Sequence, residues 1–274
     1  MSTHAFALLL CINFLFVEAA CIAPAFSQHR IQGARAAGLA NTHVALEGPW
    51  SMAGNAAGIG RMDRPHLAFA LERRFLLSEL DIRALTAVVP AGKHVFGLYV
   101  NYFGANQYNE QLVSLGCGRA LSDQFSVGFR INYHGLKIPG YTSQQAWSVA
   151  AGIQVSLDPG MRLGASVSNP HKAAFSRDLY AQIPFMASLG IAFDFSEKIM
   201  GTAALERASG TTRLRAGFEY RLHENLSLRG GISTAPFRQY GGLGLQISGL
   251  SLDLAAATHL QLGFTPQISL GYGF

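Results

Sequence analysis

The sequence predicts an all-β fold, namely a transmembrane antiparallel β-barrel of about 14 strands with an N-terminal segment that plugs or lines the lumen. Three observations predict this fold. Apolar residues alternate with polar or small ones along repeated runs of about ten residues, the length of a membrane strand. The connections between the runs alternate between tight turns and longer loops. The composition combines 49% hydrophobic residues with only 14% charged ones, about half the charged fraction of an ordinary soluble domain.

The chain divides into three regions. Residues 1–27 have the pattern of a secretory signal peptide, because an apolar run from Ala5 to Val17 precedes small residues and a cleavage motif that ends at Ser27. Residues 28–62 are irregular and rich in Gly and Ala, and we assign them to the plug segment. Residues 63–274 contain the alternating runs and are assigned to the barrel.

Two of the three cysteines, Cys11 and Cys21, belong to the signal segment, so the mature chain keeps Cys117 alone. An internal disulfide and a cysteine-built metal site are therefore excluded. An uncleaved membrane anchor and a lipoprotein site at Cys21 are the alternatives for the first region.

Fourteen strand-like runs follow one another to the end of the chain, with turn signals between them. They are approximately Leu67–Leu76, Ser78–Val89, Lys93–Phe103, Glu110–Ala120, Phe125–His134, Ala146–Leu157, Met161–Asn169, Pro184–Phe195, Ile199–Arg207, Thr211–Arg221, Leu226–Ser233, Gln239–Ile247, Leu250–Thr258 and Gln267–Phe274.

Each run has one apolar face and one polar face, as the run from Phe125 to His134 shows. Its odd-numbered positions are Phe, Val, Phe, Ile and Tyr, and its even-numbered positions are Ser, Gly, Arg, Asn and His. Successive side chains of a strand point to opposite sides. One side therefore suits lipid, and the other suits a polar lumen.

The connections support a barrel with both ends of the chain in the periplasm. Every second connection is tight: Pro90–Gly92, Leu121–Asp123, Asp158–Gly160, Ser196–Glu197, His223–Asn225 and Ser248–Gly249. The connections between them include the two longest, Gly135–Gln145 and Pro170–Ile183. Short periplasmic turns and longer outer loops produce this alternation. We expect partner recognition on the two long loops, and we expect Tyr272 and Phe274 in the periplasmic aromatic girdle.

The predicted inward face is rich in arginine. The candidate lumen-facing residues are Arg130, Asn132, His134, Arg162, Arg213, Arg215, Glu219, Arg221, Arg229 and Asp253. They fit a basic lumen that favours anionic solutes or a fatty-acid carboxylate. They equally fit a ladder of ion pairs that fills and stiffens the barrel. Nucleic-acid binding is not expected, because the basic side chains alternate with other residues along the strands and face inward.

The sequence contains no catalytic or metal-binding constellation. A Gly-x-Ser-x-Gly motif is absent, the histidines are scattered, and no His, Asp or Glu spacing suggests a metal ligand set. We therefore expect a protein that is not an enzyme and that carries no cofactor and no metal.

Several segments resemble one family of outer-membrane proteins. They are "GARAAGLANTHVALEGPWSMAGNAAGIGRM" at Gly33–Met62, "NYFGANQYNEQ" at Asn101–Gln111 and the closing "GFTPQISLGYGF" at Gly263–Phe274. In this order they resemble PorV/PorQ-like proteins, which belong with the FadL-like barrels. The family's Asn-Pro-Ala-Gly plug motif would correspond to Asn55, Ala56, Ala57 and Gly58, with Ala56 in place of the proline.

The resemblance implies a 14-stranded barrel in the outer membrane of a Gram-negative, Bacteroidetes-like bacterium, in contact with outer-membrane lipid. It implies an accessory role in protein secretion or surface attachment of the type IX kind, by binding a secreted cargo protein or a larger translocon barrel. The alternative is a FadL-like transporter or channel for hydrophobic or anionic small molecules, with a fatty acid or other lipid as ligand. A lipid-modifying enzyme and a soluble β-rich secreted protein are further alternatives.

Overall fold

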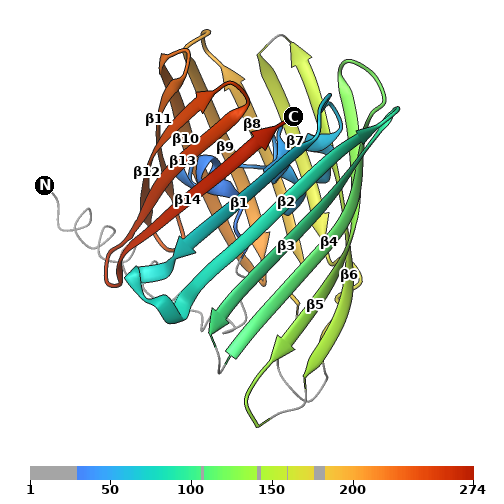
Figure 1. Ribbon diagram of the computed structural model, residues 1–274, viewed down its shortest axis with the longest axis vertical. Helices are drawn as coiled ribbons and strands as arrows, with labels where there is room; N and C mark the ends of the chain where they lie inside the picture. Colours follow the sequence, from blue (N-terminus) through green and yellow to red (C-terminus); the bar gives the residue numbers. More distant parts are fainter. Residues whose placement is uncertain (1–29, 106–107, 141–142, 159, 176–182) are drawn as a thin grey trace, which may run out of the picture.

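The computed structural model describes residues 30–105, 108–140, 143–158, 160–175 and 183–274, and they form a closed barrel of fourteen antiparallel strands (Figure 1). Each strand pairs with its neighbours in sequence, and β1 pairs with β14 to close the sheet. The strands are β1 His66–Arg73, β2 Asp81–Ala91, β3 His94–Ala105, β4 Tyr108–Ala120, β5 Phe125–Lys137, β6 Gln144–Asp158, β7 Met161–Ser168, β8 Met186–Asp194, β9 Ile199–Ala208, β10 Thr211–His223, β11 Leu226–Ser233, β12 Arg238–Ile247, β13 Leu250–His259 and β14 Gly263–Gly273.

The fold class and the strand number predicted from the sequence are confirmed. The largest boundary error is at the start of the last strand, which was predicted at Gln267 and is observed at Gly263, and smaller errors lie between the first two strands. The first strand was predicted to reach Leu76, but β1 ends at Arg73. Phe75 and Leu76 have φ angles of 53° and 62°, a left-handed conformation that a strand cannot contain. Two short 3₁₀ turns, η3 Arg74–Leu76 and η4 Ser78–Leu80, occupy the link instead.

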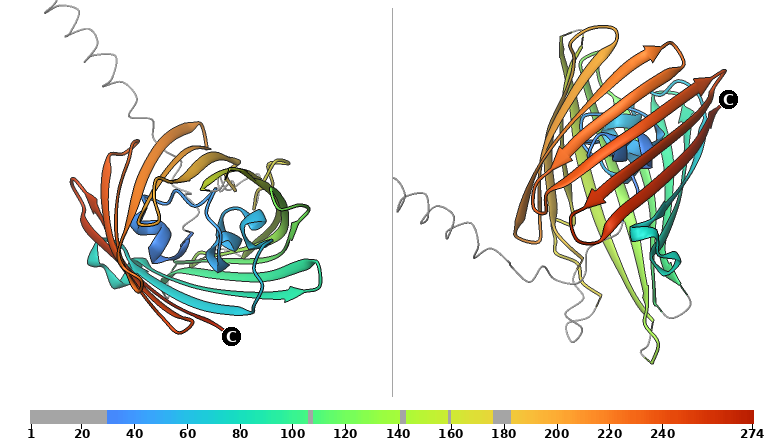
Figure 2. Two further views of the ribbon diagram at one scale, coloured as in Figure 1. Left: turned by 90° about the horizontal axis from the view of Figure 1, so that it is seen from above. Right: turned by 90° about the vertical axis from the view of Figure 1, so that its left-hand side faces the viewer.

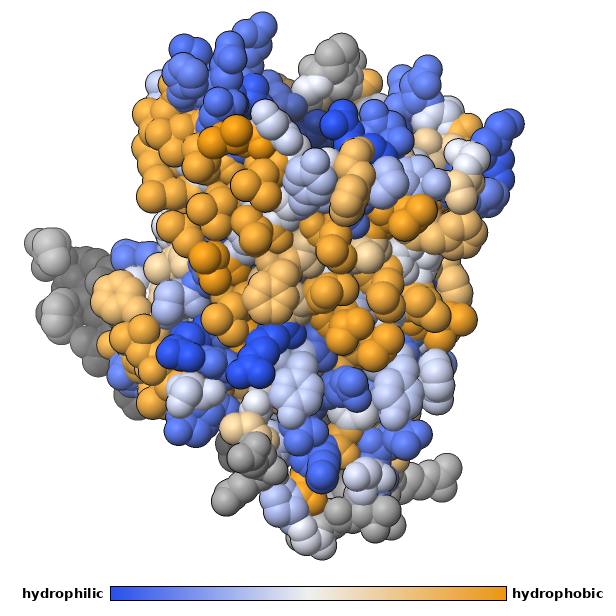
Figure 3. All heavy atoms as spheres, viewed as in Figure 1, coloured by the Kyte–Doolittle hydropathy of each residue, from blue (hydrophilic) through white to orange (hydrophobic). Residues whose placement is uncertain are grey.

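The period-two pattern separates a lipid-facing surface from an inner one. On β5, Phe129 and Ile131 are 48% and 47% exposed, whereas Arg130 and Asn132 between them are 2% and 0% exposed. On the face seen in Figure 3, apolar side chains form a belt across the middle of the molecule, with hydrophilic side chains above and below it. A strand of a closed barrel satisfies its backbone hydrogen bonds through its neighbours, so this belt can face hydrocarbon.

The two ends of the barrel differ in their connections. The end that carries the C-terminus has tight links, such as Glu224–Asn225 and Ser248–Gly249. The opposite end, which we call the outer end, carries the link between β7 and β8, although the β9–β10 link there is also a tight turn at Ser209–Gly210. Residues 141–142 and 176–182 of the two predicted recognition loops lie outside the described residues, as does the predicted signal segment, residues 1–27.

The N-terminal segment, residues 30–62, lies inside the ring of strands (Figure 2, left). It contains one short helix, α2 Gly33–Gly38, and two 3₁₀ turns, η1 Pro49–Ala53 and η2 Ala56–Ile59. Most of its residues are buried. None of the helices in the described part of the chain is long and apolar enough to cross a membrane.

Candidate functional site in the barrel lumen

The inner wall is built to admit the backbone of the N-terminal segment, because glycines stand where the segment touches it. A Cβ atom on Gly128 of β5 would collide with the backbone of Ala56, and one on Gly164 of β7 with the carbonyl group of Val44. Further glycines where a Cβ atom would come close to the backbone or a side chain of the segment are Gly97, Gly116, Gly118, Gly152, Gly190, Gly217, Gly231 and Gly242. They occur from β3 to β12, so the segment follows the wall around much of the lumen.

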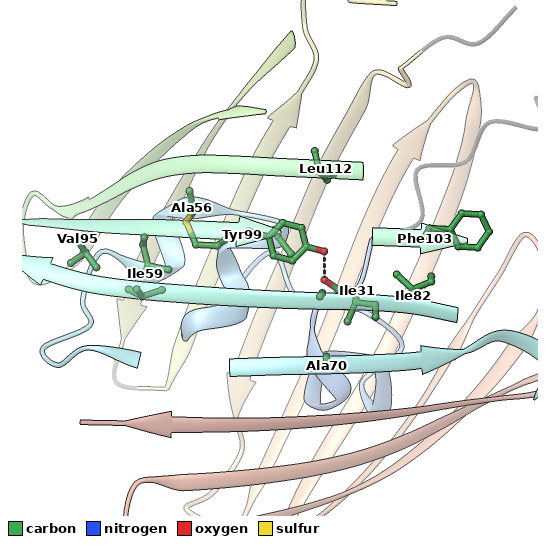
Figure 4. Close-up of a cluster of buried hydrophobic side chains, with 13 residues drawn as sticks. Ile31, Ala56, Ile59, Ala70, Ile82, Val95, Tyr99, Phe103 and Leu112 are labelled. Atoms are coloured by element: carbon green, nitrogen blue, oxygen red, sulfur yellow. Dashed lines mark hydrogen bonds between the residues drawn. The ribbon is translucent and has the colours of Figure 1, made fainter. Parts of the chain in front are cut away.

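One side of the lumen, formed mainly by β1–β4, holds the segment by apolar packing, and we call it the apolar side (Figure 4). Ile31, Met52 and Ile59 of the segment pack against wall residues that include Val88 and Tyr99. The Tyr99 hydroxyl donates a hydrogen bond to the Ile31 carbonyl oxygen over 2.7 Å. The Ile31 amide donates in turn to Asn101 Oδ1 over 3.2 Å.

Neutral polar side chains continue this side onto β4, β5 and β6. Ser114 Oγ donates to Asn132 Oδ1 over 2.7 Å, and Asn132 Nδ2 donates to Ser148 Oγ over 3.1 Å. His134 Nε2 lies 2.7 Å from the same Ser148 oxygen. Ser114, Asn132, His134 and Ser148 are at most 3% exposed. This Ser–His contact therefore belongs to a buried polar ladder that satisfies the inner wall.

The opposite side, formed by β9–β13, holds the segment by charge, and we call it the ionic side. Arg35 of α2 binds Glu219 through two hydrogen bonds of 2.9 Å. Arg229 donates to Glu219 over 2.6 Å and to Asp253 over 2.7 Å. Burial alone would lower the pKa of Arg35, but the Glu219 carboxylate reverses this effect and the pKa is raised. The Glu219 carboxylate therefore stabilises the charged form of Arg35.

A second carboxylate on the ionic side is shared by two arginines. Glu206 Oε1 accepts from Arg215 over 3.0 Å and from Arg213 over 3.5 Å. Arg215 also donates to the Ala40 carbonyl oxygen of the segment over 3.0 Å. One carboxylate cannot neutralise two guanidinium groups, so this part of the lumen keeps an excess of positive charge.

A cavity of about 260 Å³ lies beside this group, at the outer end of the barrel. Its charged lining consists of five arginines and two glutamates, namely Arg30, Arg74, Arg213, Arg215, Arg238, Glu72 and Glu206. Apolar side chains, among them Phe75 and Met186, complete the lining. Arg30 and Gln32 come from the N-terminal segment, which thus forms part of the cavity wall.

The structure brings some of the predicted lumen residues together and separates others. Arg213, Arg215, Glu219, Arg229 and Asp253 join the ionic side. Asn132 and His134 join the neutral ladder. The remaining three lie apart from these networks: Arg130 donates to the Met52 carbonyl oxygen, Arg162 pairs with Asp194 over 3.5 Å, and Arg221 is exposed at the end of β10.

The predicted plug motif lies in and next to η2. Asn55 Oδ1 accepts from the Ala57 amide over 3.1 Å, which caps the turn, and Asn55 Nδ2 donates to the carbonyl oxygen of Val44 over 2.8 Å and to that of Ile153 over 3.0 Å. Ala56, Ala57 and Gly58 form the turn itself and are buried. The asparagine therefore links two parts of the segment to β6.

Sequence reasoning missed several charged residues of the lumen: Arg30, Arg35, Glu72, Arg74, Glu206 and Arg238. Glu206 shares the inward parity of the β9 strand, which was a usable signal. Arg238 also has the inward parity of its strand, because it lies two residues before Tyr240, which lines the same cavity. The arginines of the segment carried none, because an irregular segment has no period to place its side chains.

Comparison with known proteins identifies the fold. No protein-family model matches the sequence, and no curated protein matches it. Among solved structures, the chain is similar to the toluene transporter TbuX of Ralstonia pickettii, with 15% identity, a TM-score of 0.67 and coverage of 88% of this chain and 98% of that one. It is similar to the monoaromatic hydrocarbon channel CymD, with 14% identity, a TM-score of 0.68 and coverage of 91% and 99%.

A third similar structure is a FadL homologue of Pseudomonas aeruginosa, with 12% identity, a TM-score of 0.66 and coverage of 88% and 98%. At such low identities the similarity establishes the architecture alone. The protein has the fold of FadL-type barrels. These neighbours are transporters or channels rather than enzymes. Among the described residues, no group of three or more His, Cys, Asp or Glu side chains could hold a metal ion.

Proposed function

We propose that the protein is an outer-membrane transporter or channel for small molecules, in which the N-terminal segment acts as an internal gate. The observation that carries this proposal is the segment inside the closed barrel, with a cavity beside it at the outer end. A solute that enters from outside meets this cavity first. It can cross the barrel only if the segment shifts.

The structural neighbours support transport over the role in secretion. They are described as a toluene transporter and a monoaromatic hydrocarbon channel, so hydrophobic or aromatic small molecules are the first solutes to test. The expected PorV/PorQ role, with a secreted cargo protein, a translocon partner, type IX secretion and a Bacteroidetes-like host, has no support from these comparisons.

A reversible lock on the segment tests the proposal. Thr42 Oγ1 and Thr202 Oγ1 lie 2.6 Å apart, near enough for a disulfide after replacement of both residues by cysteine. The double variant Thr42→Cys, Thr202→Cys is placed in a Cys117→Ser background, so that no other thiol of the barrel can compete.

Uptake of labelled toluene and labelled benzoate is measured in Gram-negative cells that express the full chain, with an empty vector as reference. We expect uptake above the reference, loss of uptake after oxidation of the double variant, and recovery after reduction. The Cys117→Ser single variant, treated in the same way, is the matched control. Uptake no higher than the empty vector rejects transport. Uptake that is unchanged by the lock rejects the gate.

A further inference from the structure

We propose that the outer cavity binds a small organic dianion, a compact molecule with an apolar body and two carboxylate groups. The inference deepens the transport proposal, on which it rests, by naming a class of solute that differs from toluene and the monoaromatic hydrocarbons named for the similar channels. It stands on the charge, the burial and the lining of the cavity.

The charge balance of the lining is the first argument. Five arginines face two glutamates, so the lining carries an excess of three positive charges. Glu72 pairs with Arg74 over 2.7 Å, and Glu206 is divided between Arg213 and Arg215. None of the ion pairs within the described residues includes Arg238. Cations gathered in a recess with low-dielectric walls attract anions, and a dianion gains more from them than a monoanion.

The unused donors are the second argument. The Nε atoms of Arg215 and Arg238 are buried and have no hydrogen-bond acceptor among the described residues. Buried donors are normally satisfied by protein, water or a ligand. Guanidinium groups with free donors bind carboxylates through short, charge-assisted hydrogen bonds.

The size and the apolar part of the lining argue for an organic molecule. The cavity volume of about 260 Å³ accommodates one small ring compound. Phe75, Pro184 and Met186 lie in the same lining as the arginines. An aromatic or aliphatic body can pack on these side chains while its carboxylates face the guanidinium groups.

Binding is measured by isothermal titration calorimetry on the full-length chain purified in detergent. The four probes are phthalate, benzoate, toluene and inorganic phosphate. Phthalate should bind one to one, and at least about tenfold more tightly than benzoate, because the second carboxylate makes its own charge-assisted hydrogen bonds. Toluene lacks the charge and phosphate lacks the ring, so both should also bind more weakly than phthalate.

Three variants separate the cavity from the rest of the protein. Arg238→Gln should weaken phthalate binding about tenfold. Glu72→Gln should tighten it about threefold or more, because it adds one positive charge to the excess. Arg221→Gln, the matched control, removes the same charge from the exposed end of β10 and should leave the affinity unchanged. The opposite signs expected for Arg238→Gln and Glu72→Gln cannot both result from misfolding.

The result that overturns the inference is equal affinity for phthalate, benzoate and toluene, or phthalate binding that Arg238→Gln and Glu72→Gln leave unchanged. Phosphate binding as tight as phthalate binding rejects the organic part of the proposal. The binding assay does not depend on transport. Phthalate binding that follows the predicted order without uptake in cells therefore supports this site and rejects the proposed function.

Discussion

The two sides of the lumen hold the N-terminal segment by different kinds of interaction. The apolar side uses packed side chains and neutral hydrogen bonds around Ile31 and Tyr99. The ionic side uses the chain of Arg35, Glu219, Arg229 and Asp253. Apolar packing is made of many small contributions, whereas a buried ion network loses several contributions at once when one member is removed. For the proposed gate, we expect the segment to be released at the ionic side and to turn about the apolar side.

The largest expected effect comes from breaking the ionic side at its centre. Glu219→Gln leaves the Arg35 and Arg229 guanidinium groups without the carboxylate that they share. We expect the free energy of unfolding to fall by about 3 kcal/mol, because removing one partner of a buried ion pair leaves uncompensated charge. Urea unfolding in detergent micelles measures this loss, and limited proteolysis reports release of the segment.

Glu197→Gln is the matched control for this change, since Glu197 is exposed in the tight turn between β8 and β9. It should alter the free energy of unfolding by less than about 0.5 kcal/mol. A Glu219→Gln variant as stable as this control would mean that the ion network contributes nothing to holding the segment.

The next effect sharpens the comparison by testing the close fit of the segment to the wall. Gly164→Val on β7 forces side-chain atoms into the space of the Val44 carbonyl group. We expect a loss of about 2 to 3 kcal/mol, the cost of overpacking, and a higher conductance in planar bilayers as the segment leaves the wall. Gly241→Val on β12 is the control, because a Cβ at Gly241 meets nothing within 4 Å. Equal conductance of the two variants would contradict the close fit.

The sequence predicts the strands but not these contacts between the segment and the wall. The fourteen strands were predictable, because a strand with one lipid-facing and one inward face alternates apolar and polar residues, as exposed Phe129 and buried Arg130 show. The end of β1 was not, because the left-handed Phe75 and Leu76 interrupt a run whose residues otherwise suit a strand.

The site was less predictable than the barrel. Inward parity selected Arg213, Arg215 and Glu219, but the partner of each depends on strand register and on the irregular segment, which alternation does not encode. Arg35 reaches Glu219 across 184 positions of sequence, and no local pattern connects them.

Acidification acts on a residue of the N-terminal segment itself, His43, and on none of the contacts described above for the apolar side or the ionic side. Burial lowers the pKa of His43 to about 4, and nearby Glu206, Arg215 and Arg130 act on it as well. His43 Nε2 lies 3.2 Å from Gln32 Nε2, and Nδ1 lies 2.9 Å from the Asn41 carbonyl oxygen. The ring thus fits as a neutral group, with Nδ1 as donor and Nε2 as acceptor.

The pH range of the effect follows from this shift. The folded pKa lies below the ordinary value of about 6.5, so the unfolded state binds the proton more tightly. The contribution of neutral His43 to the free energy of unfolding is fully present above pH 6.5 and is lost as the pH falls from 6.5 towards 4. At pH 5 the loss amounts to about 2 kcal/mol. Urea titrations at pH 7 and pH 5 measure it, and His43→Gln should remove this part of the pH dependence. An unchanged difference between the two pH values in His43→Gln would show that other groups cause it.

The smallest effect tests the apolar side, where a single neutral group can be removed without disturbing the packing. Tyr99→Phe deletes only the hydroxyl that donates to Ile31, and the fully buried ring keeps its contacts with the segment. We expect a loss of about 1 kcal/mol, the net value of a neutral hydrogen bond, and no increase in conductance, since the rest of the apolar cluster still holds Ile31. The same urea titration and bilayer recording measure both quantities. If Tyr99→Phe cost as much as Glu219→Gln and opened the barrel, the anchor would lie on the apolar side, and the assignment of release to the ionic side would have to be reversed.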